Sequence, residues 1–428
     1  MKLRWLLLLI FVVSSAFLTS CKISKVVEPI QGTSLSSSNI TGEKVELDYY
    51  IWGDEESYIK PVINAYCALN TNIKINLHII GTDLYESDIK SLLATDTKID
   101  LLGVRGISQM VQLYDQERLL DLTFYMKNND VDITAYGSMF NDIAISSKYY
   151  VMPTRSTCWF LLYNKAIFDN AQVSYPQQLT WDEYRQLAIS LTKGEGNDKI
   201  YGGYWVPWCY NFAALQQSSY LIDDDLTYIR ESLSLLNNFY NVDDSHFNYR
   251  KIHEKEADYR EEFEKGNIAM MPQGEWIINM LLEDQAKGIT NIDWDIAPMP
   301  VMGGQDPGIT WGQYQFISIA ADTSYPQEAF DFVKFLCGKE GARIYAQNGI
   351  IHAYTNDEIK ETYLKAVGKE AASIFFNSKR VQEQLALSGY EEVTEAFKVY
   401  AEEYLLGNIT LDDAMLKFND MRSDILNP

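Results

Sequence analysis

The pattern that most constrains the fold of this chain is a strand, a helix and a second strand in close succession. Residues 45–51 alternate between apolar and polar side chains, as a strand does, and residues 73–79 alternate in the same way. Apolar residues recur between them at helical spacing, at Ile59, Val62, Ile63 and Tyr66. A helix that joins two nearby strands predicts a parallel sheet covered by helices, which is an α/β fold.

The same alternation continues along the chain. Short apolar runs predict strands at 99–102, 158–163 and 268–271, and a helix follows the first of these toward Leu113. Helix starts are predicted by three local patterns, which are Thr180-Trp-Asp-Glu183, Pro326 and Thr410-x-x-Asp413. From residue 356 to the end, the pattern predicts an almost wholly helical segment.

Length and charge limit what the chain can do. A chain of 428 residues, 47% of them hydrophobic, is too long for one core, which favours two domains. The formal net charge is -23, and residues 1–20 hold two basic and no acidic residues, so the rest carries -23 - 2 = -25. A charge this negative repels phosphate backbones, so we expect no nucleic-acid partner.

The histidines and cysteines show no spacing typical of a metal site or a catalytic dyad. The four histidines are scattered, and no two cysteines form a CxxC pair. Cys158 lies in an apolar run, which favours a buried free thiol. We therefore predict no metal, no cofactor and no catalytic residue.

The N-terminus has the pattern of a secretory signal. Lys2 and Arg4 precede an apolar run over 6–17, which Leu18-Thr-Ser-Cys21 follows. The run is shorter than the about 20 residues that a membrane span needs. The Cys resembles the lipobox of bacterial lipoproteins, which implies a signal peptide over 1–20 and a lipidated Cys21 outside the cytoplasm. Residues 21–44 are rich in Ser, Thr and Gly and predict a flexible tether.

Several further segments occur together in a recognisable order. They are Tyr50-Ile-Trp-Gly-Asp54, Arg118-Leu-Leu-Asp-Leu-Thr123, Met152-Pro153, Leu162-Tyr-Asn-Lys165, Leu179-Thr-Trp-Asp-Glu183, Phe263-Glu-Lys-Gly-Asn-Ile-Ala-Met270, Gly274-Glu-Trp276, Trp294-Asp-Ile-Ala-Pro-Met-Pro300 and Ala329-Phe-Asp-Phe-Val-Lys-Phe-Leu336. With these segments in this order, the chain resembles the family 1 extracellular solute-binding proteins of ABC importers, the maltose-binding-like group. One departure is Gly349-Ile-Ile-His-Ala353, where such proteins often have a Gly-x-x-Pro turn.

The resemblance implies a type II, maltose-binding-like periplasmic-binding-protein fold, with two α/β lobes joined by a hinge. The first lobe would comprise 45–153 plus 299–347, and the second 154–298 plus 348–428. The lobes would close on a carbohydrate and pass it to ABC transporter permease subunits. The resemblance also implies a monomeric binding protein rather than an enzyme, held at the cell membrane through Cys21.

Sugars present apolar faces that stack on aromatic rings and hydroxyls that bond to polar side chains. Candidate residues of both kinds follow predicted strands, where α/β sheets bind ligands, or lie in loops bounded by Gly and Pro. The expected ligand contacts are Trp52, Asp54, Glu55, Arg105, Arg155, Trp205, Trp208, Glu275, Trp276, Trp311 and Tyr314. A core position for Trp52 and a surface ion pair for Arg105 remain alternatives at this point.

Two other functions remain open. A secreted glycosidase needs two carboxylates about 5 to 10 Å apart, and the adjacent Glu261 and Glu262 fit a solvated helix face better. The same fold could instead bind a peptide or a polyamine, with Asp54, Glu55 and Glu275 as carboxylate partners.

Overall fold

The computed structural model describes residues 44–427. The predicted signal peptide, Cys21 and the tether up to residue 43 lie outside these residues. The described chain is an α/β protein, as predicted. Among residues 44–427, no helix is both long and apolar enough to cross a membrane.

The first sheet has the strand order β2-β1-β3-β10-β4. Its strands are β1 (Val45–Trp52), β2 (Ile73–Ile80), β3 (Leu101–Val104), β4 (Met152–Ser156) and β10 (Tyr314–Ile319). β1 pairs in parallel with β2 and β3, which confirms the predicted strand–helix–strand unit, and β10 runs antiparallel to β3 and β4. The third strand begins two residues later than the predicted 99–102, because ladder pairing starts at Leu101.

The second sheet has the order β6-β7-β5-β8. Its strands are β5 (Trp159–Asn164), β6 (Tyr201–Gly203), β7 (Ile268–Gly274) and β8 (Trp294–Ala297). A third, two-stranded sheet pairs β9 (Ile309–Gly312) with β11 (Lys379–Gln382) in parallel. The segment from residue 356 onward is mostly helical, as predicted, and β11 is the strand within it that the sequence pattern did not indicate. A distant strand forms the β11 ladder, and four residues carry little local pattern.

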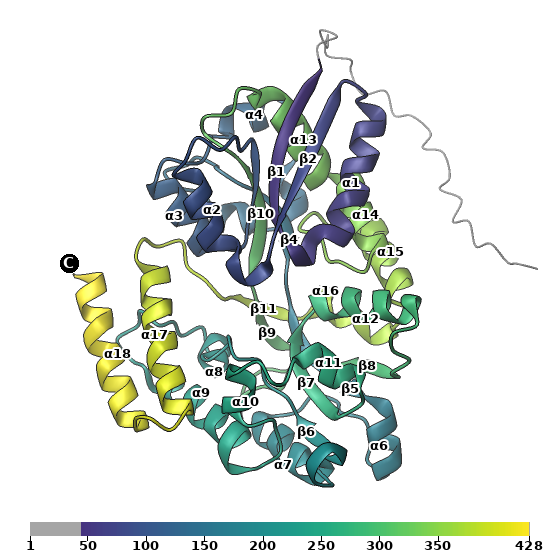
Figure 1. Cartoon of the computed structure of the whole chain (residues 1–428), viewed down its shortest axis with the longest axis vertical. Coiled ribbons are helices and arrows are strands. Elements are labelled where there is room, and N and C mark those ends of the chain that lie inside the picture. The colour runs from purple at the N-terminus through teal and green to yellow at the C-terminus, as the bar shows by residue number, and fades with distance from the viewer. Residues whose placement is uncertain (1–43, 428) are drawn as a thin grey trace, which may run out of the picture. The chain divides into compact units, whose positions relative to one another are not determined.

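The helices cover these sheets (Figure 1). They are α1 (Glu56–Leu69), α2 (Tyr85–Leu93), α3 (Ile107–Asp115), α4 (Thr123–Asn128), α5 (Met139–Asp142), α6 (Lys165–Ala171), α7 (Trp181–Leu191), α8 (Phe212–Gln216), α9 (Thr227–Asn237), α10 (Tyr249–His253), α11 (Tyr259–Glu264), α12 (Trp276–Lys287), α13 (Pro326–Cys337), α14 (Lys339–Gln347), α15 (Asp357–Val367), α16 (Ile374–Asn377), α17 (Tyr390–Leu405) and α18 (Leu411–Leu426). The predicted starts are confirmed: Thr180 and Thr410 form capping boxes, and Pro326 opens α13.

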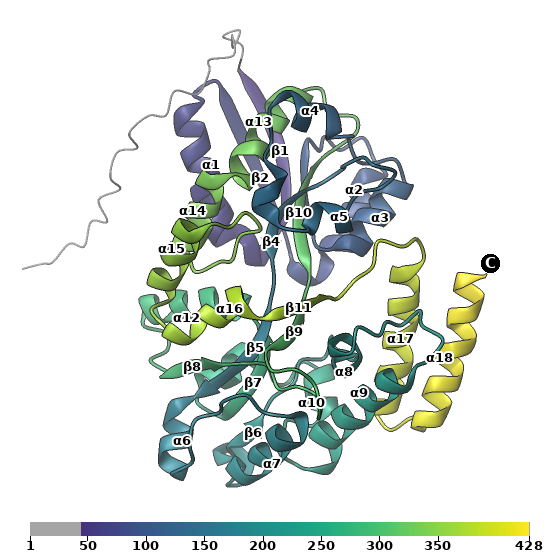
Figure 2. The ribbon, with the colours of Figure 1, turned by 180° about the vertical axis from the view of Figure 1, so that it is seen from behind.

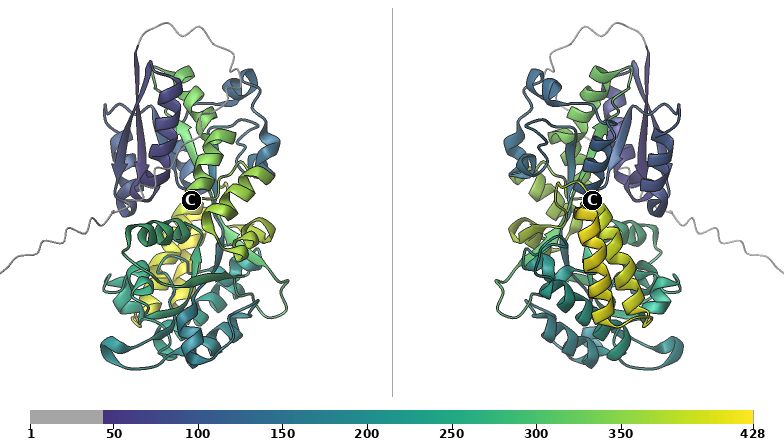
Figure 3. Two further views of the ribbon diagram at one scale, coloured as in Figure 1. Left: turned by 90° about the vertical axis from the view of Figure 1, so that its right-hand side faces the viewer. Right: turned by 90° about the vertical axis from the view of Figure 1, so that its left-hand side faces the viewer.

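Buried side chains form two hydrophobic cores. One core contains β1, β3, β10 and α13, and we call it the first core. The second core contains β5, β7, β8 and α12, together with side chains from α15, α17 and α18. Figure 2 shows β4 and β10 running from the first sheet toward β9 and β11, and Figure 3 shows α17 and α18 side by side. The exact lobe boundaries given above stay a prediction.

Candidate functional site

A buried chain of polar groups joins the two cores. Arg155, on β4, forms an ion pair with Glu275, which precedes α12. Its other terminal nitrogen donates to the Tyr58 hydroxyl at 3.0 Å, and that hydroxyl donates to Glu55 Oε1 at 3.0 Å. The Cys158 N–H donates to the second Glu275 oxygen at 3.0 Å. We call Glu55, Tyr58, Arg155 and Glu275 the buried network.

The buried network holds more negative than positive groups. Arg155 and Glu275 are 3% and 0% exposed, and both Glu275 oxygens have protein partners. Burial raises the pKa of Glu55 to about 7, although Arg155 and Tyr58 oppose that rise. Burial alone would lower the pKa of Arg155, but Tyr58, Glu275 and Glu55 raise it overall. The structure thus brings three predicted ligand contacts together, and each already contacts a protein partner.

A second group of predicted residues lies on the surface of the second core. Trp276, the first residue of α12, is partly exposed, and its ring stands edge-on to Trp159 with centroids 5.5 Å apart. A Cβ at position 274 would overlap this ring, so Gly274 is what lets Trp276 fold back over the end of β7. Gly274 is therefore the local signal that fixes the position of the indole.

Two further aromatic side chains extend this surface. Trp208 is 48% exposed and meets the Tyr259 ring edge-on at 5.7 Å. Burial raises the pKa of Tyr259, and the Asp54 carboxylate across from it raises that pKa further. Asp54, an exposed residue that follows β1, therefore lies near enough to Tyr259 to act on the charge of its hydroxyl. We call Trp208, Tyr259 and Trp276 the aromatic face.

Glu383 is linked to the aromatic face through Trp159, which contacts both Glu383 and Trp276. The Trp159 indole N–H donates to Glu383 Oε1 at 2.7 Å. The residue follows β11, and its backbone N–H donates to the Gly312 carbonyl at 3.0 Å. Burial raises the pKa of this partly exposed carboxyl to about 7, against the effect of the Trp159 hydrogen bond. Within residues 44–427, no cation lies within ion-pair distance of Glu383 or Asp54.

Arg105 and Trp52 contact each other at the edge of the first sheet. The Arg105 guanidinium lies 5.6 Å from the Trp52 ring centroid and donates to the Thr82 carbonyl at 3.1 Å. It also lies 3.7 Å from a Glu86 oxygen, which is the surface ion pair weighed above. Trp52 is 3% exposed and packs in the first core, so its core alternative fits the structure better than a ligand contact.

Three further predicted aromatic contacts are buried, as Trp52 is. Trp205 and Trp311 have no exposed surface and pack in the second core with Trp159. Tyr314 packs in the first core and donates to Asp142 at 3.0 Å. Stacking on a ligand needs an open ring face, so these three residues are excluded from the site proposed below.

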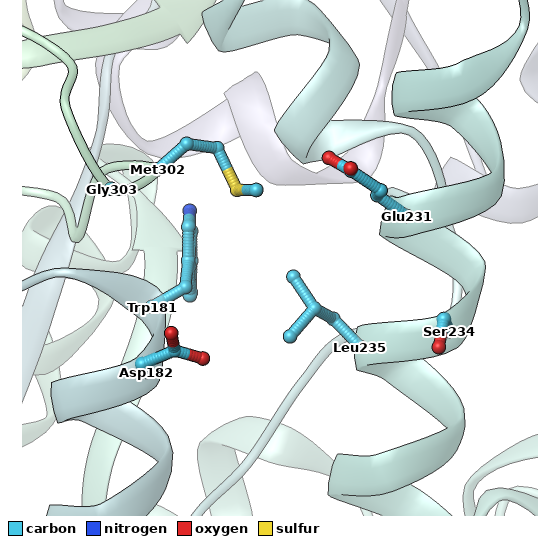
Figure 4. A pocket seen from close by; sticks show the side chains of 7 residues that line it. All are labelled: Trp181, Asp182, Glu231, Ser234, Leu235, Met302 and Gly303. Carbon is cyan, nitrogen blue, oxygen red and sulfur yellow. The ribbon is translucent and has the colours of Figure 1, made fainter.

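Hollows lie on both sides of the described chain. One, of about 560 Å³, lies between the β1–α1 segment and helices α11 and α12, and polar residues such as Asp54, Ser57 and Asn279 line it. This volume is within the range of about 300–1,000 Å³ that is typical of ligand pockets. The other, of about 210 Å³, lies at the surface of the second core, where Trp181 and Met302 face Glu231 and Leu235 (Figure 4).

The sequence reasoning missed Tyr58, Tyr259 and Glu383. Tyr259 follows Asp258, which caps α11, so the helix start was a readable signal. Tyr58 and Glu383 have no such local signal, because their positions depend on contacts with residues far away in the sequence. Glu261 and Glu262 lie on α11, where Glu261 is exposed and Glu262 accepts from Lys265 at 2.7 Å, as expected for a solvated helix face. The described cysteines are free, and burial raises the pKa of Cys158 to about 12.

The model of the bacterial extracellular solute-binding proteins matches residues 52–343. The chain belongs to this family. The predicted resemblance is therefore confirmed, and the family places the protein outside the cytoplasm and among solute-binding proteins. A search of curated proteins finds no match to this sequence.

Several solved structures have the same fold as this chain. A sugar transporter from Rhizobium etli in an open conformation is 24% identical, with a TM-score of 0.74 over 89% of this chain and 99% of that one. An ABC substrate-binding protein from Listeria monocytogenes in complex with cycloalternan is 21% identical, with a TM-score of 0.78 over 90% and 98%. A maltose/maltodextrin-binding domain from Bdellovibrio bacteriovorus bound to maltotriose is 14% identical, with a TM-score of 0.71 over 90% and 100%. These likenesses establish the fold.

Proposed function

We propose that this protein binds a sugar or oligosaccharide between its two cores and delivers it to the permease subunits of an ABC transporter. The observation that carries the proposal is the aromatic face, where the Trp276 ring is partly exposed beside Tyr259 and Trp208 and Asp54 lies opposite. Rings and a carboxylate at one surface suit the apolar faces and hydroxyls of a sugar. The sugars bound by proteins of the same fold support this choice of ligand.

In the proposed site, Trp276 stacks on a sugar ring, Trp208 and Tyr259 extend the aromatic face, and Asp54 accepts hydrogen bonds from hydroxyls. Arg105 lies at the edge of this site, already paired with protein groups. The buried network supports the site from behind and does not contact the ligand. The lobes close on the ligand as hinged bodies, and the protein acts as a monomer.

The closing motion has a direct test. Small-angle scattering of the full chain should give a smaller radius of gyration when a sugar that binds is present at saturation. An unchanged radius would contradict a closing cleft.

We also propose that Cys21 carries lipid and holds the protein at the outer face of the cell membrane. The basic start, short apolar run and Cys21 support this. Radiolabelled palmitate should enter the wild-type protein and be absent from Cys21→Ala. Label in that variant would contradict the anchor.

A thermal-shift screen tests the ligand class. A ligand at about 100 times its dissociation constant adds about 2.7 kcal/mol to stability. We expect a shift with a neutral oligosaccharide and no release of products from chromogenic glycosides. Turnover of such a glycoside would contradict a pure binding role.

A cationic solute such as a polyamine or a basic peptide is the second candidate. The specific observation in its favour is that Asp54 and Glu383 lack cation partners among residues 44–427 and lie beside aromatic rings. A shift with spermidine and none with any sugar would replace the first proposal with this one.

A further inference from the structure

The charged groups beside the aromatic face differ in how far the protein already satisfies them. Arg155 donates a hydrogen bond to Tyr58 and forms an ion pair with Glu275. Arg105 donates to the Thr82 carbonyl and lies within ion-pair distance of Glu86. Arg260 is paired with Asp284 and Glu264. The guanidinium groups of these three arginines therefore already have protein partners. Arg380, on β11, donates through one nitrogen to the Ser156 and Thr157 carbonyls at 3.1 and 3.0 Å and has no ion-pair partner within residues 44–427.

Glu383 is in the opposite situation. One oxygen accepts the Trp159 N–H, and no cation partner lies within residues 44–427. Its backbone is fixed on both sides, because its N–H donates to Gly312 and its carbonyl accepts from the Tyr390 hydroxyl at 3.3 Å. The carboxylate is thus held in place while part of its accepting capacity stays unused.

An ionised carboxylate in this position affects a ligand in two ways. It accepts hydrogen bonds from hydroxyl groups, and such bonds to a charged group are stronger than neutral ones. It also repels another carboxylate, and that repulsion is large where burial limits screening by water. Glu275 is buried nearby, but Arg155 neutralises its charge. Glu275 therefore does not add to the repulsion of a ligand carboxylate.

We propose that Glu383 is a specificity-determining residue, whose carboxylate accepts hydrogen bonds from the hydroxyls of a neutral sugar and excludes sugars that carry a carboxylate. This inference rests on the proposed function, since it concerns the same sugar site. Trp159 acts as a positioning residue that orients the Glu383 carboxylate. Asp54, on the opposite side of the site, adds to the repulsion.

The test compares matched neutral and acidic sugars. Maltotriose, mannotriose, cellotriose and galactotriose are first screened by thermal shift against the full chain. The neutral sugar that binds is then titrated calorimetrically beside its counterpart with C6 carboxylates. The titrations are run at about pH 8, above the raised pKa of Glu383, with wild type, Glu383→Gln and the control Glu392→Gln, an exposed residue of α17.

We expect wild type and Glu392→Gln to bind the neutral sugar and to reject the acidic one. Glu383→Gln should bind the neutral sugar about tenfold more weakly, as loss of a charged acceptor implies. The same variant should lower the ratio of neutral to acidic affinity by at least about tenfold, an effect that a merely structural role would not produce. Affinities for both sugars within about twofold of wild type would overturn the proposal.

A measurement on the wild type keeps the proposal testable if Glu383→Gln does not fold. Raising the salt concentration from about 0.05 M to about 0.5 M screens charge repulsion. The acidic sugar should then bind more tightly, with little change for the neutral one. Equal salt dependence for both sugars would overturn the role of Glu383. If no sugar of the panel binds wild type at all, the proposed function itself fails and this inference fails with it.

Discussion

Two groups of side chains between the cores carry the same chemical types but differ in what they contact. In the buried network, Arg155 contacts both Glu275 and Tyr58, and these three side chains are at most 3% exposed. On the aromatic face and beside it, Trp276 and Glu383 are partly exposed, and Glu383 lacks a cation partner in residues 44–427. A buried charge that is already paired has little capacity left for a ligand, and loss of its partner destabilises the fold. An open ring or an unpaired acceptor leaves room for a ligand.

The largest expected effect is that of replacing Arg155, which distinguishes a structural role in the buried network from a ligand contact. Arg155→Met leaves Glu275 buried without a counter-charge, which typically costs about 3–5 kcal/mol of folding free energy. Urea denaturation should show this loss, and calorimetry on the folded fraction should show sugar affinity changed by less than about fivefold. A near-native unfolding midpoint combined with lost affinity would instead make Arg155 a ligand contact.

The pH dependence of stability should report Glu55. Its pKa is raised from 4.5 to about 7 in the folded chain, so folding favours the protonated carboxyl. This contribution is fully present below about pH 4.5 and is lost as the pH rises through about 7, with a difference of roughly 3 kcal/mol between these limits. Glu55→Gln should therefore gain stability relative to wild type at about pH 8 and flatten the slope of melting temperature against pH.

The exposed Glu361→Gln serves as the control for this measurement. It should leave the slope of melting temperature against pH unchanged. A wild-type slope in Glu55→Gln would show that Glu55 titrates in the folded chain as it does in the unfolded one.

Tyr58→Phe tests the middle of the buried network. The change removes a hydroxyl that donates to Glu55 and accepts from Arg155, which should cost about 1–3 kcal/mol of stability because two buried groups lose a partner. Chemical denaturation measures the loss. Stability within about 0.5 kcal/mol of wild type would mean that water or a shifted side chain replaces the hydroxyl.

The smallest expected effect concerns Trp208, at the rim of the aromatic face. Because its ring is 48% exposed, Trp208→Ala should leave the melting temperature unchanged and weaken sugar binding by about fivefold, which is about 1 kcal/mol. Titration calorimetry measures this loss. Unchanged affinity for every sugar that binds would show that Trp208 does not contact the ligand and that the site is confined to the residues around Trp276.

Local patterns predicted much of the fold but only part of the site. The strand alternation at 45–51, the capping box at Thr180 and the proline that opens α13 were legible because each depends on a few adjacent residues. β11 was missed because its partner β9 lies about seventy residues earlier along the chain. Trp205 and Trp311 were predicted as ligand contacts because an aromatic residue in a loop looks the same in sequence whether its ring is open or buried.

The charged residues show the same limit. Arg155 and Glu275 both follow readable motifs, yet only the folded chain reveals that they pair with each other. Glu383 lies in a stretch without a motif, and its position depends on the pairing of β11 with β9 and on the Trp159 indole. Sequence therefore identified residue types that suit a sugar, and the contacts decide which of them remain available.

The most direct test of the account is the affinity of Trp276→Ala for the neutral sugar that binds wild type, measured by titration calorimetry together with the melting temperature. The Trp276 ring lies partly exposed over Gly274, and removing a stacking aromatic anchor costs about 2 kcal/mol or more of binding free energy, roughly a 30-fold loss. We predict this loss with a near-native melting temperature. Unchanged affinity in a protein whose folding free energy falls by about 3–5 kcal/mol, as expected for a core tryptophan, would contradict the proposed site.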